Sequence, residues 1–217
     1  MIVAIDGPAA SGKSTTAKLL AKKMDFIHLN SGLMYRAVTF ILIENNLLNN
    51  ITDSIQLIFK NLQFKGQNLD IVYYKDIEIT DKLYDEEINK NINIVSNNYF
   101  VRKKLIEHQR FLVKNKNVIC EGRDIGSVVF PNAEFKFYLN ADIDTRAERR
   151  FEDLRKNNSS VSKKEIIKNI MNRDKNDKSR KISPLIKVKD CIEVNTTKLT
   201  INQQVEYIYS IIIKNRK

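Results

Sequence analysis

The chain has few of the residues that cross-link small proteins, bind metals or break regular structure. Its 217 residues include no Trp, 2 Cys, 2 His, 3 Pro and 6 Gly. Cys120 and Cys191 are far apart in apolar stretches, so the sequence supports neither a disulfide framework nor a zinc site, and we expect both thiols in the core. His28 and His108 have no ligand partner at metal spacing, and we interpret both as structural residues.

Long hydrophobic runs are also missing. No apolar segment approaches the roughly 20 residues that cross a bilayer, and the first residues, MIVAIDG, lack the features of a signal peptide. We therefore expect a cytoplasmic protein without a membrane partner. With 42% hydrophobic residues the chain can bury a sizeable core, which excludes wholly disordered proteins and fits one domain with a small insertion.

Acidic residues are outnumbered by basic ones, 26 to 37, which gives a formal net charge of +11. This balance favours an anionic partner, because net charge governs which partners are attracted to a protein. Nucleic acid, an acidic membrane surface and a phosphorylated small molecule all satisfy that condition. Charge alone does not choose among them.

Short apolar runs alternate with stretches of helical periodicity. The first run, residues 2–5, is continuous, which is typical of a strand buried on both faces of a parallel sheet. Further strands are predicted at 26–29, 118–120, 135–139 and 191–194. Helices are predicted at 14–24, 32–44, 100–115, 143–157, 163–176 and 200–214. The alternation predicts an α/β fold with a parallel five-stranded sheet flanked by helices.

Two segments interrupt this alternation. Between Leu62 and Thr80 the hydrophobic period changes to about two, with LDIVYY and IEIT separated by Lys75-Asp76, which predicts a small antiparallel insertion. The Asn-, Lys- and Ser-rich segment 156–164 carries little to bury, and it predicts a mobile connection between two helices.

Residues 7–14 read GPAASGKS, a full match to the phosphate-binding pattern G-x-x-x-x-G-K-[ST], between a predicted strand and a predicted helix. The two glycines let backbone N–H groups converge on phosphate oxygens, and the helix N-terminus adds about half a positive elementary charge. Lys13 supplies a mobile full charge, and Ser14 offers a hydroxyl to Mg²⁺. We call this segment the donor cradle, and its predicted members are Gly7, Pro8, Ala9, Ala10, Ser11, Gly12, Lys13, Ser14 and Thr15.

The donor cradle predicts a nucleoside triphosphate but names no acceptor. The dinucleotide pattern G-x-G-x-x-G is excluded because Ala9 stands where it requires glycine, so hydride transfer is not expected. The D-x-x-G and N-K-x-D elements of common GTPases are absent as well.

Three further polar clusters are candidates for the acceptor site. Residues 30–36 (NSGLMYR) and 121–126 (EGRDIG) follow predicted strand ends, at the sheet edge where such folds bind ligands. In the third, Arg173, Asp177 and Arg180 fall at spacings of four and three, on one helical face. That face suits a phosphorylated ribose, and taken alone it equally suits a solvated, salt-bridged surface.

With these clusters in this order, the sequence resembles bacterial cytidylate kinases over nearly its whole length. The resemblance rests on GPAASGKS at 7, SGLMYR at 31, VRKKLIEHQR at 101, EGRDIGSVVFPNA at 121, RAERR at 146 and RDKNDKSRKISPL at 173. GRDIG followed by VVFP is specific to this family among nucleotide kinases. The resemblance implies one P-loop kinase domain over 1–217, with an inserted monophosphate-side domain at about 61–98 and a helical lid at about 149–165.

The resemblance also implies roles for single residues. Arg36, Arg123 and Arg180 would hold the monophosphate, since a guanidinium meets two phosphate oxygens at once. Arg102 and Asp124 would read the cytosine edge, with the carboxylate accepting from the amine that uracil lacks. The other residues implied in the acceptor site or in transfer are Ser31, Asn93, Arg173 and Asp177 around CMP, and Arg149 and Arg150 at the transferred phosphoryl.

Three residues depart from the family pattern. Asn30 and Glu121 stand where Asp is common, and Asn93 stands where Ser is common. Glu121 keeps its charge and a possible role near Mg²⁺ through water, whereas Asn30 puts any acidic role at that position in doubt. Asn93 can still accept from an amine, and it can also relax the preference for cytosine. For Arg149 and Arg150, the same pattern also suits a plain basic helix face.

We expect a monomeric kinase that transfers phosphoryl from MgATP to CMP or dCMP without a nucleic-acid partner. One alternative is a kinase with the same cradle that acts on UMP, shikimate or dephospho-coenzyme A. The other is a basic nucleic-acid-binding ATPase, which the charge and runs such as Lys103-Lys104 and Lys163-Lys164 favour. The sequence lacks the interleaved aromatic and basic residues that stack bases, which weighs against that second alternative.

Overall fold

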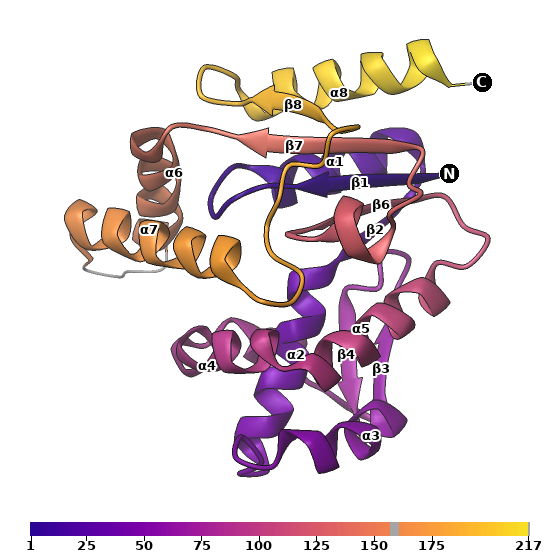
Figure 1. The fold of residues 1–217 in the computed structure, drawn as a ribbon, viewed down its shortest axis with the longest axis vertical. Coiled ribbons are helices and arrows are strands. Elements are labelled where there is room, and N and C mark those ends of the chain that lie inside the picture. The colour runs from indigo at the N-terminus through magenta and orange to yellow at the C-terminus, as the bar shows by residue number, and fades with distance from the viewer. Residues whose placement is uncertain (157–160, 217) are drawn as a thin grey trace. The chain divides into compact units, whose positions relative to one another are not determined.

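The structure is a computed structural model that describes residues 1–156 and 161–216. It contains a five-stranded sheet in the order β2-β6-β1-β7-β8 (Figure 1). The strands are β1 Ile2–Asp6, β2 Ile27–Asn30, β6 Val118–Gly122, β7 Phe135–Asn140 and β8 Ile192–Asn195. β7 pairs in parallel with both β1 and β8. The predicted parallel sheet and its five strands are confirmed.

The six predicted helices are present with shifted ends. They are α1 Lys13–Met24, α2 Ser31–Glu44, α5 Tyr99–Leu112, α6 Ile143–Lys156, α7 Lys163–Ser179 and α8 Ile201–Asn215. The sequence analysis missed four elements, which are α3 Ile51–Asn61, α4 Glu86–Asn97, the 3₁₀ turn η1 Thr80–Tyr84 and the π-helical turn η2 Ile125–Val129.

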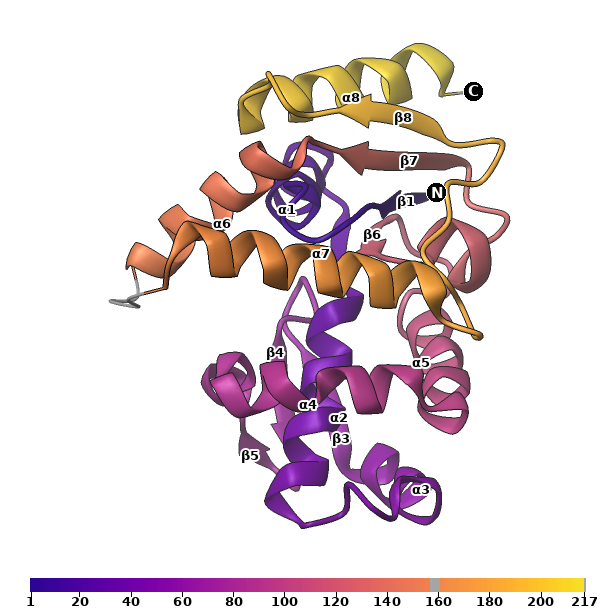
Figure 2. The same cartoon turned by 60° about the vertical axis from the view of Figure 1, so that its left-hand side comes forward.

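The chain forms two compact units. The outer unit comprises Met1–Asp25 and Ile119–Lys217, and the middle unit comprises Phe26–Val118. In the outer unit, β1 is central, and Val3, Ala4 and Ile5 are fully buried, which explains its unbroken apolar run. Helix α1 packs against α8, while α6 and α7 lie side by side (Figure 2).

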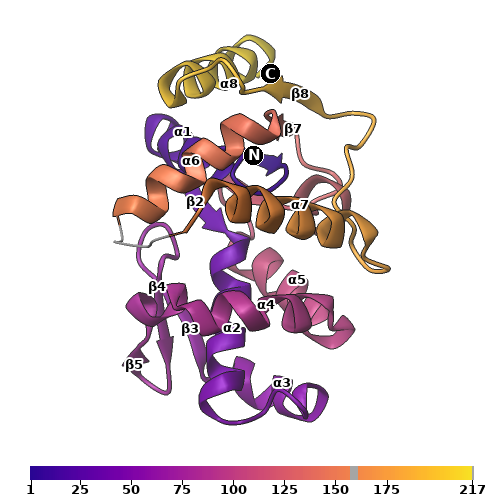
Figure 3. The ribbon, with the colours of Figure 1, turned by 90° about the vertical axis from the view of Figure 1, so that its left-hand side faces the viewer.

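The middle unit is built around α2, which contacts α3, α4, α5 and η1 (Figure 3). It also holds the antiparallel sheet β3 Leu62–Lys65, β4 Ile71–Tyr74 and β5 Ile77–Glu78. Lys75 and Asp76 join β4 to β5 with φ values of 49° and 64°. Two consecutive residues with positive φ are typical of a type I′ turn, whose twist matches that of the strands. The predicted antiparallel insertion is confirmed.

The two cysteines differ in burial. Cys120 is buried as expected, but Cys191 is only half-buried, so the expectation that it lies in the core was wrong. It lies beside β8, the last strand of the sheet order, where less of the chain covers it.

The predicted mobile connection 156–164 and the predicted lid both include residues 157–160, which lie outside the described part of the chain. Within residues 1–156 and 161–216, no helix combines the length and apolar character required to cross a bilayer.

Candidate active site

The donor cradle connects the end of β1 to the start of α1. Gly7 passes the sheet so closely that a Cβ atom on it would lie 2.2 Å from the carbonyl oxygen of Leu139 in β7, which explains why this position needs glycine. Gly12 adopts φ 87° as the N-cap of α1 and accepts a hydrogen bond from the Thr16 N–H at 3.0 Å. The two glycines therefore shape the turn that the motif predicts.

Lys13 is the most perturbed cation of the cradle. Its side chain is 6% exposed, and its Nζ donates to the carbonyl oxygen of Pro8 at 3.2 Å. Burial, helped by the nearby charge of Arg123, lowers the pKa of Lys13 to about 7, and the Glu121 carboxylate opposes part of that shift. An ammonium buried in this way gains strongly when a polyphosphate arrives beside it.

Side chains of α6 and α7 form hydrogen bonds with the backbone of Ala9 in the donor cradle. The Ala9 N–H donates to the Asp174 carboxylate at 3.0 Å, and Arg146, which forms an ion pair with Asp174, donates to the Ala9 carbonyl at 3.1 Å. The Ala9 side chain packs in an apolar cluster with Ala147, Ile166 and Ile170. The Ala9 amide is thus engaged by protein in this structure, and α6 and α7 position the loop.

Arg149 contacts the loop that follows β8. Its guanidinium donates to the Thr196 carbonyl at 2.7 Å and to the Thr196 hydroxyl at 3.1 Å. That hydroxyl in turn donates to the carbonyl oxygen of Ser11, at 3.1 Å, within the cradle. Arg150 is exposed. The predicted contact of Arg149 and Arg150 with the transferred phosphoryl stays a prediction.

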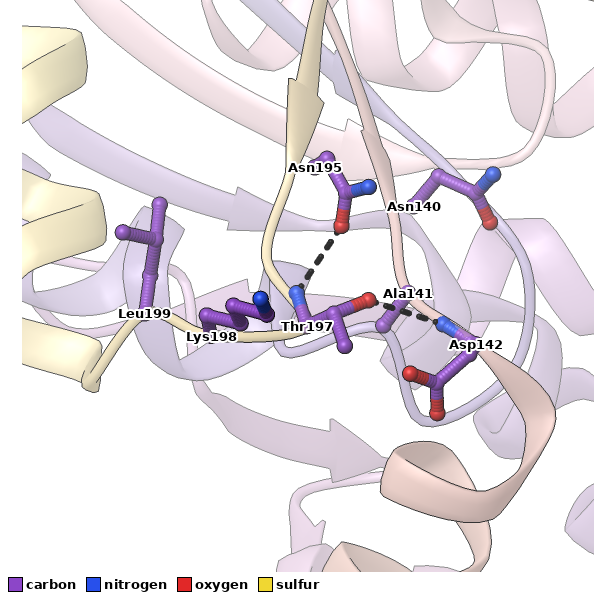
Figure 4. Close-up of a pocket in the computed structure, with 7 residues that line it drawn as sticks. All are labelled: Asn140, Ala141, Asp142, Asn195, Thr197, Lys198 and Leu199. Carbon is purple, nitrogen blue, oxygen red and sulfur yellow. Dashed lines mark hydrogen bonds between the residues drawn. The ribbon is translucent and has the colours of Figure 1, made fainter.

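A pocket of about 520 Å³ lies where β7 and β8 end (Figure 4). Its wall is ordered by two hydrogen bonds, from the Thr197 N–H to the Asn195 side chain and from the Asp142 N–H to the Thr197 hydroxyl, both at 3.0 Å. The lining residues are Asn140, Ala141, Asp142, Asn195, Thr197, Lys198 and Leu199. Its volume falls in the range of small-molecule sites. The carboxyl ends of parallel strands are also where α/β folds bind ligands.

Two of the candidate arginines share one buried carboxylate. Asp177 is 1% exposed, and its Oδ2 accepts from the Arg123 Nε at 2.7 Å, while its Oδ1 forms an ion pair with Arg180. Burial alone raises the pKa of Asp177, but the charges of Arg123 and Arg180 outweigh it and hold the pKa below its ordinary value. Asp177, predicted as a ribose contact, therefore also fixes two guanidinium groups.

Four of the charged candidates lie close enough to Lys13 for their charges to shift its pKa. The charges of Arg123, Glu121, Arg173 and Asp177 all act on the Lys13 ammonium. Glu121 and Asp124 are buried at the end of β6 and just beyond it, at 3% and 5% exposure. Within the outer unit, the structure therefore brings the donor cradle together with several acceptor candidates.

The candidates of the middle unit lie on three helices that pack against one another, α2, α4 and α5. Asn30 is the N-cap of α2, and its side chain accepts from the Leu33 N–H at 3.1 Å. Asn caps helices as well as Asp does, so this departure from the family keeps the capping role. Ser31, the first residue of α2, is 5% exposed.

Arg36 and Arg102 are both held by polar groups of neighbouring helices. Arg36 donates to the Leu83 carbonyl at 2.9 Å and to the Asn89 side chain at 2.8 Å. Arg102, 2% exposed, donates to the Ser96 carbonyl at 2.6 Å and to the Tyr35 hydroxyl at 3.2 Å. Asn93 is half-buried on α4, three residues before Ser96. These contacts hold the side chains of Arg36 and Arg102 in place.

Both histidines lie in the middle unit, and His28 is buried within β2. The His108 ring on α5 packs against Phe59 and Phe64, with ring centroids 5.4 and 5.8 Å apart, and burial lowers its pKa.

Among the residues that the structure describes, no three His, Cys, Asp or Glu side chains lie together as a metal site. Ser14 is exposed in the first turn of α1, and Glu121 acts on the neighbouring Lys13, so both fit a Mg²⁺ ion held mainly by nucleotide phosphates.

Comparison with known proteins identifies the family. A family model described as cytidylate kinase matches residues 3–214. The chain belongs to the cytidylate kinase family. It is 42% identical over 208 residues to the cytidylate kinase of Fusobacterium nucleatum, with 96% of this chain and 95% of that protein covered. It is 39% identical over 215 residues to that of Halalkalibacterium halodurans, covering 96% and 95% of the two chains.

The chain is therefore an enzyme, a kinase with a P-loop nucleotide-binding motif, as the sequence analysis expected. A crystal structure of a Thermus thermophilus protein has the same fold, with a TM-score of 0.50, 17% sequence identity and coverage of 100% of this chain and 98% of the other.

The sequence analysis missed two buried carboxylates near the cradle. They are Asp174, which directly follows Arg173, and Asp6, which directly precedes Gly7. Both accept hydrogen bonds from backbone N–H groups more than 100 residues away, at separations of 165 residues for Asp174 and 119 for Asp6. The only available signal was a carboxylate next to a binding motif, which does not reveal its partner.

Proposed function

We propose that this kinase transfers the γ-phosphoryl group of ATP to the phosphate of CMP and dCMP, giving CDP and dCDP. The main support is the arrangement in the outer unit, where Arg123 and Arg180 are fixed on Asp177 and the charges of Arg123 and Asp177 act on Lys13. The cytidine monophosphate acceptor is inferred from membership in the cytidylate kinase family.

The proposed reaction is an in-line displacement in which an oxygen of the acceptor phosphate is the nucleophile. That oxygen is ionised near neutral pH, so the protein needs no strong general base. Its task is to position two polyanions, whose unit charges repel by about 4 kcal/mol at 4 Å and a dielectric constant of about 20. Lys13, Arg123 and Arg180 carry the positive charge that offsets this repulsion.

The donor is proposed to bind with its phosphates in the cradle and its base in the pocket at the ends of β7 and β8, which Asn195 and Thr197 line on either side of Thr196. Support comes from the hydrogen bond of the Thr196 hydroxyl to the Ser11 carbonyl, which joins the pocket's loop to the cradle. Ser14, and Glu121 through water, would hold Mg²⁺, which supplies charge neutralisation between the phosphates when bound.

Recognition of the acceptor is assigned to the residues that the resemblance to cytidylate kinases implies. Arg36, Arg123 and Arg180 are proposed to hold the phosphate, while Arg102, Asp124 and Asn93 are proposed to read the base. Ser31, Arg173 and Asp177 complete the acceptor contacts. A monomeric, cytoplasmic enzyme that uses no nucleic acid remains part of the proposal.

The proposal is tested by steady-state kinetics with CMP, dCMP and UMP on the wild type and on Asp124→Ala. The wild type should prefer both cytosine acceptors, and Asp124→Ala should reduce the ratio of kcat/KM for CMP to that for UMP by about tenfold or more, because one base-specific hydrogen bond contributes about 1.4 kcal/mol or more.

Two outcomes would contradict this assignment. Strong activity on UMP, shikimate or dephospho-coenzyme A with none on CMP would overturn the acceptor. An equal loss for CMP, dCMP and UMP in Asp124→Ala would remove base reading from Asp124 and leave the acceptor unchanged.

A further inference from the structure

Asp6 is a buried carboxylate that joins the donor side of the outer unit to the loop that carries Arg123 and Asp124. It is the last residue of β1, directly before Gly7, and is 6% exposed. Its Oδ1 accepts from the Ile125 N–H and its Oδ2 from the Gly126 N–H, both at 2.8 Å. These two N–H groups open the η2 turn, immediately after Asp124.

The turn depends on this carboxylate because its first N–H groups have no helical carbonyl to bind. The other end of the turn is closed by the Asp124 carbonyl, which accepts from the Val128 N–H at 2.8 Å and the Val129 N–H at 3.1 Å. Asp124 is therefore held between a turn that folds back on its carbonyl and a carboxylate that fixes the next two amides.

Burial of the Asp6 carboxylate costs free energy, which argues that the carboxylate has a function at this position. Burial raises the pKa of Asp6 to about 6 and the neighbouring Asp124 charge adds to that shift, while the two N–H groups and Arg123 oppose it. The carboxylate gives each of the two N–H groups an acceptor oxygen of its own. A buried group that bears such a cost beside reactive residues is typical of a functional site.

We propose that Asp6 is a positioning residue for the acceptor, holding the η2 turn so that Arg123 and Asp124 keep their places relative to the donor cradle. The inference rests on the proposed function. In-line transfer is sensitive to misplacement, since a shift of about 1 Å can lower the rate about a hundredfold. Both oxygens of Asp6 bind the η2 turn, so its loss should affect the acceptor and the chemical step more than the binding of ATP.

The test is steady-state kinetics of Asp6→Asn and Asp6→Ala with CMP, UMP and ATP. Asparagine keeps one acceptor oxygen and places an amide N–H against the second backbone donor. We expect KM for CMP to rise about tenfold, kcat to fall about a hundredfold and the ratio of CMP to UMP efficiency to shrink, with KM for ATP within about twofold of the wild type. Asp6→Asn should retain more activity than Asp6→Ala. Glu206→Gln, an exposed carboxylate paired with Lys23, is the control and should match the wild type.

Gly126→Val perturbs the same contact from the side of the turn, which keeps the test decisive if the Asp6 variants fail to fold. A Cβ there would already be in contact, 3.4 Å from the Asp6 Oδ2 and 3.3 Å from the Lys136 Cδ, so the two further methyl groups of valine should displace the carboxylate. It should give the same CMP-selective loss.

The inference is overturned if the Asp6 or Gly126 variants raise KM for ATP and CMP equally, or if they leave both unchanged while the wild type phosphorylates CMP. A wild type that does not phosphorylate CMP at all would instead overturn the proposed function.

Discussion

Replacement of Lys13 by methionine is expected to lower kcat/KM for phosphoryl transfer on the order of a thousandfold or more, because it removes the ammonium that the donor cradle offers to a triphosphate. Methionine keeps the length and apolar stem of the buried side chain, so the fold should survive. Lys18→Met, an exposed lysine on the same helix, is the matched control and should retain wild-type kinetics. A Lys13→Met enzyme within tenfold of the wild type would contradict the assignment.

A second readout of the same variant depends on the low pKa of Lys13. With a pKa of about 7, Lys13 is mostly neutral at pH 8 before ligand binds, and a bound triphosphate should raise that pKa again. Calorimetry with metal-free ATP in buffers of different ionisation enthalpy should then report uptake of about one proton at pH 8 in the wild type. Lys13→Met should abolish this uptake, and equal uptake by both proteins would contradict the explanation.

Asp177→Asn is expected to have the second-largest effect, because two arginines lose their common carboxylate. Breaking a buried ion pair from one side lowers the free energy of unfolding by about 3 kcal/mol, since the two guanidinium groups stay buried and lose the carboxylate that neutralises them. In addition, Arg123 and Arg180 should lose their fixed positions, so kcat/KM for CMP should fall about a hundredfold or more. Urea unfolding and steady-state assays measure the two effects.

Glu193→Gln provides the control for this variant. Glu193 also forms an ion pair, with the Lys187 Nζ at 2.7 Å, but the side chains of Glu193 and Lys187 are 42% and 54% exposed. Exposed pairs contribute little, so neither stability nor kinetics should change appreciably. If Asp177→Asn behaved like Glu193→Gln, the shared carboxylate would not organise the acceptor arginines.

The sheet could be predicted from the sequence because burial on both faces leaves a local signal. Residues 2–5 and 118–120 are unbroken apolar runs, and in the structure residues 3–5 and 118–120 are fully buried, while Ile2 at the start of β1 is half-buried. Helix α3 was missed although Ile51, Ile55 and Ile58 mark one buried face, because the Asn-rich flank and the short length hid the period. Helix α4 contains four Asn residues, a poor helix former, and its packing against α2 compensates for that.

The candidate site was predictable where chemistry follows a local motif. The turn over Gly7 and Gly12 and the first turn of α1 lie within one motif, so the sequence indicated the cradle directly. Two sets of contacts join segments that are far apart in the chain, and no local sequence pattern indicates them. They are the hydrogen bonds of Asp174 and Arg146 to Ala9 and the hydrogen bonds of Asp6 to η2. The type of each residue was visible, but its partner was not.

The most direct test of the account follows the fate of the terminal phosphoryl group of ATP. Purified protein is incubated with ATP labelled at the γ-phosphate, CMP and Mg²⁺, and the products are separated and counted. The account predicts that the label leaves ATP only when CMP is present and appears in the β-phosphate of CDP, with one ADP formed for each CDP. Label released as inorganic phosphate, or label that stays in ATP whether or not CMP is added, would contradict it.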